Sequence, residues 1–297
     1  MADLVDPIQD KSNLRLSCEV TRVTNSRPGV VDIEAADGFR SSFDDVLVTA
    51  PLGWLKRNER QVFSPPLSPG LSTAIQSLGY GNLDKVFIKF PDAFWNDATP
   101  ESNENQTSKI ARDATGPTFP IESLFLRPDY ATDTNPARWR QEIISFSGLP
   151  DQLSQPVVMF FVYGQWGRHI TGLVRDMDQD SKEYYRILND NFEPYYSKLP
   201  NYDPSSDRCK PSSFMSTDWQ GDKFAGFGSF TNQPTGLGDS APHFETLREG
   251  MGQDRGIWFA GEHTSPLGGL GTVTGAYWSG EEAARRIARR HGATIKL

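Results

Sequence analysis

The chain has 297 residues, is 37% hydrophobic and carries a formal net charge of −8, with a pI near 5.1. An acidic chain whose longest basic stretch is Arg285–Arg290 is unsuited to direct nucleic-acid binding. The longest apolar run, Val157–Tyr163, has the length of a strand and not of a membrane span. The length allows about two domains, each with its own core.

The ends of the chain and its cysteines predict a location. The first residues, Met1–Lys11, are polar and contain no secretory signal. Cys18 and Cys209 lie far apart and in no metal-ligand spacing, which favours a reducing compartment. The last residues, Ile295–Leu297, partly resemble a peroxisomal address but lack its small first residue. We therefore expect an intracellular protein, cytoplasmic or peroxisomal.

The first part of the chain predicts a strand meander. Leu14–Val23 alternates apolar and polar residues like a half-buried strand, and Val30–Ala35 continues in the same mode. Asp37-Gly38 predicts a hairpin-like turn. Ser41–Asp45 then leads into the apolar segment Val46–Ala50, which is typical of a buried strand.

The middle of the chain predicts a mixture of strands and helices. Strand alternation within Gly79–Trp95 places Lys85, Phe87 and Lys89 on one face. Asn96–Pro120 is polar and rich in turn residues, so we expect a long loop. The remaining predicted elements are helices over Gly70–Leu78 and Asp178–Leu199 and strands over Glu122–Phe125, Glu142–Phe146 and Val157–Tyr163.

The stretch Gly256–Arg286 carries the strongest functional pattern. A short buried strand, Ile257–Ala260, is followed by a glycine-rich loop, and Thr272 or Thr274 can cap the next helix. The small and apolar residues predicted to face its neighbours are Ala276, Gly280, Ala283 or Ala284, and Ile287. Unpaired N–H groups at such a helix start suit an anionic or electron-accepting ligand. An ordinary βα unit with a flexible turn would give the same pattern.

The motif FAGEHT, followed by a glycine loop and TVTGAYWSGEEAA, resembles the C-terminal signature of the flavin-containing amine oxidases. This family includes monoamine and polyamine oxidases and flavin-type histone lysine demethylases. The resemblance implies that Gly261 and Glu262 belong to the FAD site, with Glu262 hydrogen-bonding the FAD chain. It places the backbone of Thr272 and Val273 at the pyrimidine end of the flavin. The family usually has histidine where this chain has Thr274.

Further residues gain a role from the same resemblance. The valine matching Val20 holds the adenine through its backbone, and Pro51 lies in the matching segment VLVTAPLGWLK. Lys85 matches the lysine that holds a water against flavin N5. Phe230 and Thr272 match the two walls of a slot for the amine. From the residues alone, Val20 and Phe230 are equally explained as core, and Lys85 as a solvated strand lysine.

The implied fold is α/β: a partial, Rossmann-like FAD-binding domain of the amine oxidase type, with an inserted α+β substrate-binding domain. The boundaries we expect are 1–56 and 221–297 for the FAD-binding domain and 57–220 for the substrate-binding domain. The glycine motif G-x-G-x-x-G that opens such a domain is absent from the sequence. We therefore expect a fragment, a split protein whose N-terminal βαβ half is separate, or a degenerate relative.

Two functions follow as hypotheses. The first is FAD-dependent oxidation of an amine, a polyamine or another, to an imine, with oxygen as acceptor and hydrogen peroxide as product. The second is a ligand- or partner-binding remnant of the same fold without catalysis. A metal site is not predicted, because the four histidines have no ligand spacing. They are His169, His243, His263 and His291.

Overall fold

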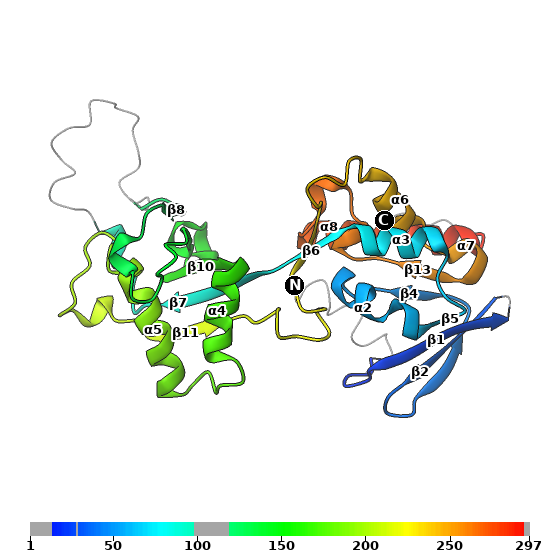
Figure 1. Ribbon diagram of the computed structural model, residues 1–297, viewed down its shortest axis with the longest axis horizontal. Helices are drawn as coiled ribbons and strands as arrows, with labels where there is room; N and C mark the ends of the chain where they lie inside the picture. Colours follow the sequence, from blue (N-terminus) through cyan, green and yellow to red (C-terminus); the bar gives the residue numbers. More distant parts are fainter. Residues whose placement is uncertain (1–13, 28, 98–118, 294–297) are drawn as a thin grey trace. The chain divides into compact units, whose positions relative to one another are not determined.

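The structure is a computed structural model that describes residues 14–27, 29–97 and 119–293, and it divides into two compact units (Figure 1). Unit 1 comprises the residues up to Gly81, Lys223–Gly226 and the residues from Phe230 onward. Unit 2 comprises Asn82–Asp222 and Phe227–Ser229, so it is inserted into unit 1. The mixture of helices and sheets confirms the predicted α/β content.

The first division falls after Gly81, whereas the sequence predicted it after residue 56. The reason lies in packing: the segment between these two positions buries Val62, Leu71 and Ile75 in the core of unit 1. Residues 57–81 therefore belong with unit 1. The FAD-binding and substrate-binding roles assigned to the two parts stay predictions.

The described part of unit 1 contains three sheets. The largest has the strand order β3-β2-β1-β5, in which β1, β2 and β3 are antiparallel and β5 is parallel to β1. A second sheet pairs β4 with β13 in parallel, and a third pairs β6 with β12 antiparallel. The strands are β1 Val20–Arg27, β2 Val30–Ala35, β3 Arg40–Phe43, β4 Val46–Val48, β5 Phe63–Ser64, β6 Gly79–Gly81, β12 Phe230–Asn232 and β13 Ile257–Phe259.

The helices of unit 1 surround a core in which β13 is fully buried. Helix α8 ends near the strands, where the carboxylate of Asp45 accepts hydrogen bonds from Trp258, Arg290 and His291. Burial acts to raise the pKa of Asp45, but these hydrogen bonds outweigh it and hold the pKa below the usual 3.8. The helices are α2 Leu52–Val62, α3 Pro69–Ser77, α6 Ala241–Glu249, α7 Gly252–Arg255 and α8 Val273–Arg290.

Unit 2, over its described residues, is an antiparallel sheet with the order β11-β7-β10-β9-β8 together with the helices α4 and α5. Side chains alternate along β7: Val86 and Ile88 are fully buried, whereas Lys85 and Phe87 on the other face are half-buried. The elements are β7 Leu83–Lys89, β8 Glu122–Phe125, β9 Gln141–Ser145, β10 Val157–Tyr163, α4 Gly164–Val174, α5 Lys182–Tyr196 and β11 Ser213–Ser216.

Several elements agree with the sequence and others differ. The strands Val30–Ala35 and Val157–Tyr163 have the predicted bounds, and α3 and α5 lie in the predicted segments. Strand β1 starts only at Val20, so the alternation before it belongs to no strand. Helices α2, α4, α6 and α7 were not predicted. Most of the predicted loop Asn96–Pro120, and the terminal residues Ile295–Leu297, lie outside the described residues.

Helix α8 begins where the sequence predicted it. Thr272 is its N-cap, and the Thr272 hydroxyl accepts a hydrogen bond of 2.9 Å from the Gly275 N–H. The residues it buries are Gly275, Ser279 and Ala283, spaced four apart. The prediction had placed Ala276 and Gly280 on this face, one residue later than the buried Gly275 and Ser279. Ser279 faces the end of β13, because its Oγ accepts a hydrogen bond of 2.8 Å from the Gly261 N–H.

Candidate functional site

The centre of the candidate site in unit 1 is the carboxylate of Glu262, which follows β13 and Gly261 at the start of the short turn Glu262–Thr264. Oε1 accepts hydrogen bonds from the Thr231 N–H at 3.1 Å and from the Thr231 hydroxyl at 2.6 Å. Oε2 accepts from the Gly271 N–H at 2.9 Å. The carboxylate thus joins strand β12 to the loop that precedes helix α8.

The two residues predicted to form the amine slot are sequence neighbours of the residues that bind Glu262. Phe230 comes directly before Thr231, and Thr272 comes directly after Gly271. The Phe230 ring packs against Gly271, because a Cβ at residue 271 would lie 3.2 Å from its Cδ2 atom. Gly271 has φ +69°, a left-handed conformation that favours glycine. Phe230 is half-buried, and Thr272 is exposed at the start of α8.

The N-terminus of α8 points its first amides out of the helix. Over the described residues, the N–H groups of Val273 and Thr274 in the first turn have no carbonyl acceptor within the helix, because the first such acceptor, Thr272, binds Ala276. Val273 is 67% exposed. The close approach of Gly275 to the Gly269 carbonyl holds this end in place, since a Cβ on Gly275 would lie 2.0 Å from that oxygen.

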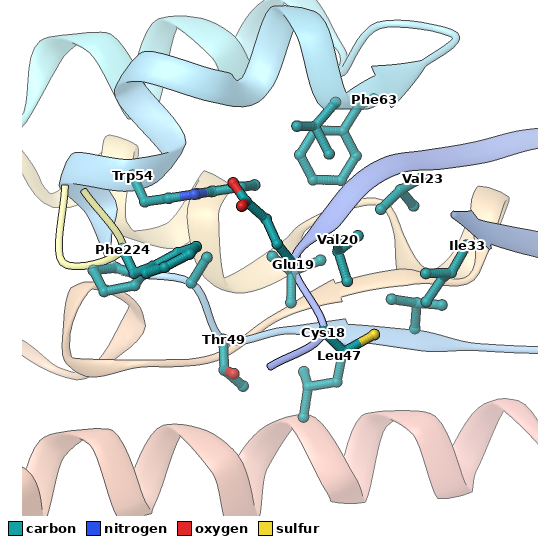
Figure 2. A pocket seen from close by; sticks show the side chains of 15 residues that line it. Cys18, Glu19, Val20, Val23, Ile33, Leu47, Thr49, Trp54, Phe63 and Phe224 are labelled. Carbon is teal, nitrogen blue, oxygen red and sulfur yellow. The ribbon is translucent and has the colours of Figure 1, made fainter. Parts of the chain in front are cut away.

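A cavity of about 390 Å³ lies elsewhere in unit 1, beside strands β1 and β4 (Figure 2). Its lining is mainly apolar and includes Val20, predicted to hold the adenine of FAD, and Pro51, also predicted to bind the cofactor. Figure 2 shows the rings of Trp54 and Phe224 at one end of this cavity. The other lining residues are Cys18, Glu19, Val23, Ile33, Val46, Leu47, Val48, Thr49, Ala50, Val62 and Phe63.

Lys85 lies in unit 2, on the half-buried face of β7. Its ammonium nitrogen is 5.9 Å from the centre of the Phe161 ring on the neighbouring strand β10, within the range of a cation–π contact. The Lys85 N–H donates to the Thr217 hydroxyl at 2.9 Å, which fixes the strand on its other side. The side chain thus projects from a strand that is paired on both sides, with β10 and with β11.

His263 is a buried histidine next to Glu262. It is 1% exposed, and within the described residues its Nε2 atom has no hydrogen-bond partner. Burial lowers the pKa of His263 from 6.5 to about 4, so its ring is neutral at pH 7. Among the described residues, no group of three or more histidine, cysteine or acidic side chains could hold a metal ion. Over the same residues, no helix is long and apolar enough to cross a membrane.

Sequence reasoning missed further residues of these sites, among them Thr231, Gly271, Trp54 and Phe224. Thr231 and Gly271 bind Glu262, but their sequence separations from it, 31 and 9 residues, follow no local period. Trp54 and Phe224 line the cavity, and Phe224 is 50% exposed. An aromatic residue placed directly after a Pro-Leu-Gly turn, or in a polar loop, is the signal that could have identified these two.

The chain resembles known proteins over most of its length. The family model of the flavin containing amine oxidoreductases matches residues 1–288. Lysine-specific histone demethylase 1B homolog of Caenorhabditis elegans is 26% identical over 304 residues, which cover 99% of this chain and 32% of that protein. Peroxisomal N(1)-acetyl-spermine/spermidine oxidase of Homo sapiens is 31% identical over 134 residues, which cover 45% of this chain and 23% of that protein.

The chain spans only part of such relatives. Protein anon-37Cs of Drosophila simulans, 26% identical over 282 residues, is matched over 94% of this chain and 48% of its own length. Each of these three relatives is thus matched over less than half of its own length. The family model matches nearly all residues of the chain, and this match shows the family to which the chain belongs. Because the family contains a flavin, it implies FAD as the cofactor of this chain. The chain therefore belongs to the family of flavin-containing amine oxidoreductases.

Proposed function

We propose that this chain provides the amine site and part of the FAD site of an enzyme that oxidises an amine to an imine, with oxygen as acceptor and hydrogen peroxide as product. The observation that carries the proposal is the junction at Glu262, which brings Phe230 and the start of α8 together in a member of a flavin family. Relatives named as a polyamine oxidase and as histone demethylases support an amine substrate, a polyamine or another.

The residues present are suited to FAD. The apolar cavity at Val20 and Pro51 has the size and lining of a small-molecule site. The amides of Val273 and Thr274, at the start of α8, suit a carbonyl or anionic group. When bound, FAD supplies the two-electron acceptor that the oxidation of a C–N bond requires.

The side chains of this chain bind and orient. Phe230 offers the face of its ring to the amine, and the exposed Thr272 leaves the opposite wall open to broader substrates. No side chain is assigned to remove a proton, because the amine can lose its proton to water and react in its neutral form. Lys85 holds a water molecule for the step in which oxygen returns the cofactor to its oxidised form, since its ammonium group can donate three hydrogen bonds.

We further propose that a βαβ unit carrying the glycine motif, which these 297 residues lack, completes the FAD site. Within the described residues, β4 pairs only with β13, and a two-stranded parallel sheet is marginal without further strands. The glycine motif that would hold the pyrophosphate is also absent from the sequence.

The affinity for FAD should differ measurably between the chain alone and the chain together with a βαβ unit. The chain alone is expected to bind FAD with a Kd weaker than about 1 μM, equivalent to about −8 kcal/mol. A βαβ unit from a relative, supplied as a second polypeptide, should tighten binding at least about tenfold, because its loop adds charge-assisted hydrogen bonds to the pyrophosphate. Quenching of FAD fluorescence measures both affinities.

The control for this titration is the same βαβ unit with its phosphate-loop glycines replaced by valine, which should give no gain. Submicromolar binding by the chain alone would contradict the need for a second half. Failure to bind FAD under both conditions would favour the second candidate function, a non-catalytic remnant that binds a ligand or partner. We retain this second candidate function because the sequence lacks the glycine motif that would hold the pyrophosphate of FAD.

A further inference from the structure

Glu262 has a role in unit 1 that is separate from contact with the cofactor. We infer that it is a positioning residue whose carboxylate sets the distance between the two walls of the amine slot, Phe230 and Thr272. The identity of the slot rests on the proposed function, whereas the contacts that hold its walls belong to the chain itself.

The three hydrogen bonds of Glu262 reach the residues adjacent to both walls. Oε1 takes two donors from Thr231, the residue after Phe230, and Oε2 takes the N–H of Gly271, the residue before Thr272. The two oxygens of a carboxylate have a fixed separation, so the two backbone segments cannot move apart without breaking at least one bond. The carboxylate therefore acts as a clamp between β12 and the loop before α8.

Because of the packing around this clamp, loss of the Glu262 hydrogen bonds would change the position of the slot walls. Thr231 is 2% exposed, so loss of its acceptor would leave a buried N–H and a buried hydroxyl without a partner. Phe230 lies directly on Gly271, where a Cβ would come within 3.2 Å of its ring. A shift of Gly271 is thus transmitted to the aromatic wall by contact.

The same bonds limit what else Glu262 can do. An ionised carboxylate has about four acceptor positions. Three of them are occupied by donors of this chain. At most about one position remains for a hydroxyl of the cofactor, so the main energetic role of Glu262 is to hold the slot together.

Hydrogen exchange tests the clamp without cofactor or substrate. In Glu262→Gln the new NH2 group cannot accept a hydrogen bond, so one of the two segments loses its partner. We expect the Gly271 or Thr231 amide to exchange about tenfold faster than in the wild type, in NMR or mass-spectrometric measurements. Glu281→Gln, which changes an outer carboxylate of α8, is the matched control and should leave both amides unchanged.

Amine selectivity tests the consequence for the slot. In the FAD-loaded protein, kcat/KM is compared for n-butylamine and dibenzylamine. Glu262→Gln and Thr231→Val should shift this ratio about threefold or more in the same direction, and the double variant should shift it no further than the larger single change, because both remove the same clamp. Thr231→Ser keeps the hydroxyl and should restore the wild-type ratio.

The outcomes separate the two proposals. Unchanged exchange at both amides in Glu262→Gln overturns the clamp, whatever the enzyme oxidises. Faster exchange with an unchanged amine ratio overturns the positioning role, and so does full additivity of the two variants. If the wild type oxidises neither amine nor any other, the proposed function fails, and the exchange measurement alone decides whether Glu262 joins the two segments.

Discussion

Replacing Gly275 by valine is expected to destabilise the protein by about 3 kcal/mol or more, because the site has no room for a side chain. A Cβ at this position would lie 2.0 Å from the Gly269 carbonyl oxygen and 2.8 Å from the Ser265 hydroxyl oxygen. Both neighbours are held in the loop before α8, so the start of the helix has to move. Urea unfolding followed by circular dichroism measures the change in the free energy of unfolding.

Gly280 in the same helix provides the matched control. A Cβ there would meet no atom within 4 Å, so Gly280→Ala should raise the free energy of unfolding by about 0.5–1 kcal/mol through helix propensity. A Gly275→Val variant as stable as the wild type would show that α8 does not pack closely on the loop. The FAD affinity of Gly275→Val should also fall, because the Val273 and Thr274 amides move with the helix.

The second large effect is a loss of stability in acid caused by His263. Its pKa is about 4 in the folded chain against 6.5 for the free side chain, so the unfolded state binds a proton that the folded state does not between these values. The stabilisation is complete above about pH 6.5 and is lost as the pH falls towards 4. It amounts to about 3 kcal/mol, from 1.36 kcal/mol for each pH unit.

An apolar replacement isolates this contribution. His263→Leu should flatten the fall in the free energy of unfolding between pH 6.5 and 4, as measured by urea titrations at several pH values. His169→Gln changes an exposed histidine in unit 2 and should leave the fall unchanged. An equally steep fall in His263→Leu would assign the acid sensitivity to other groups.

Local sequence patterns predicted the elements whose formation depends on residues close together in the sequence. The continuous apolar run Val157–Tyr163 became the central strand β10 with the predicted bounds, and Thr272, one of the two predicted caps, starts α8. Helix α2 was missed because its interior, Lys56–Gln61, is charged. One of those charges, Glu59, is 3% exposed and is held by Ser72 and Gln76 of the next helix.

Some residues of the candidate site could likewise be predicted from the sequence, and others could not. The family motifs located Glu262, Phe230 and Thr272, which unit 1 brings together, and Val20 with Pro51, which share a cavity. The clamp between Glu262, Thr231 and Gly271 could not be predicted, because it depends on a contact between strand β12 and a loop far along the chain. Tertiary packing creates that contact.

The most direct test of amine oxidation is reduction of the bound flavin by an amine. The chain with saturating FAD, and with a βαβ unit as a second polypeptide, is mixed without oxygen with mono-, di- and polyamines and a methylated lysine peptide. We expect that at least one of these bleaches the visible flavin band, that air restores the band with hydrogen peroxide, and that Lys85→Met slows only the restoration. A flavin band that no amine bleaches, with or without the βαβ unit, would contradict the proposed oxidation.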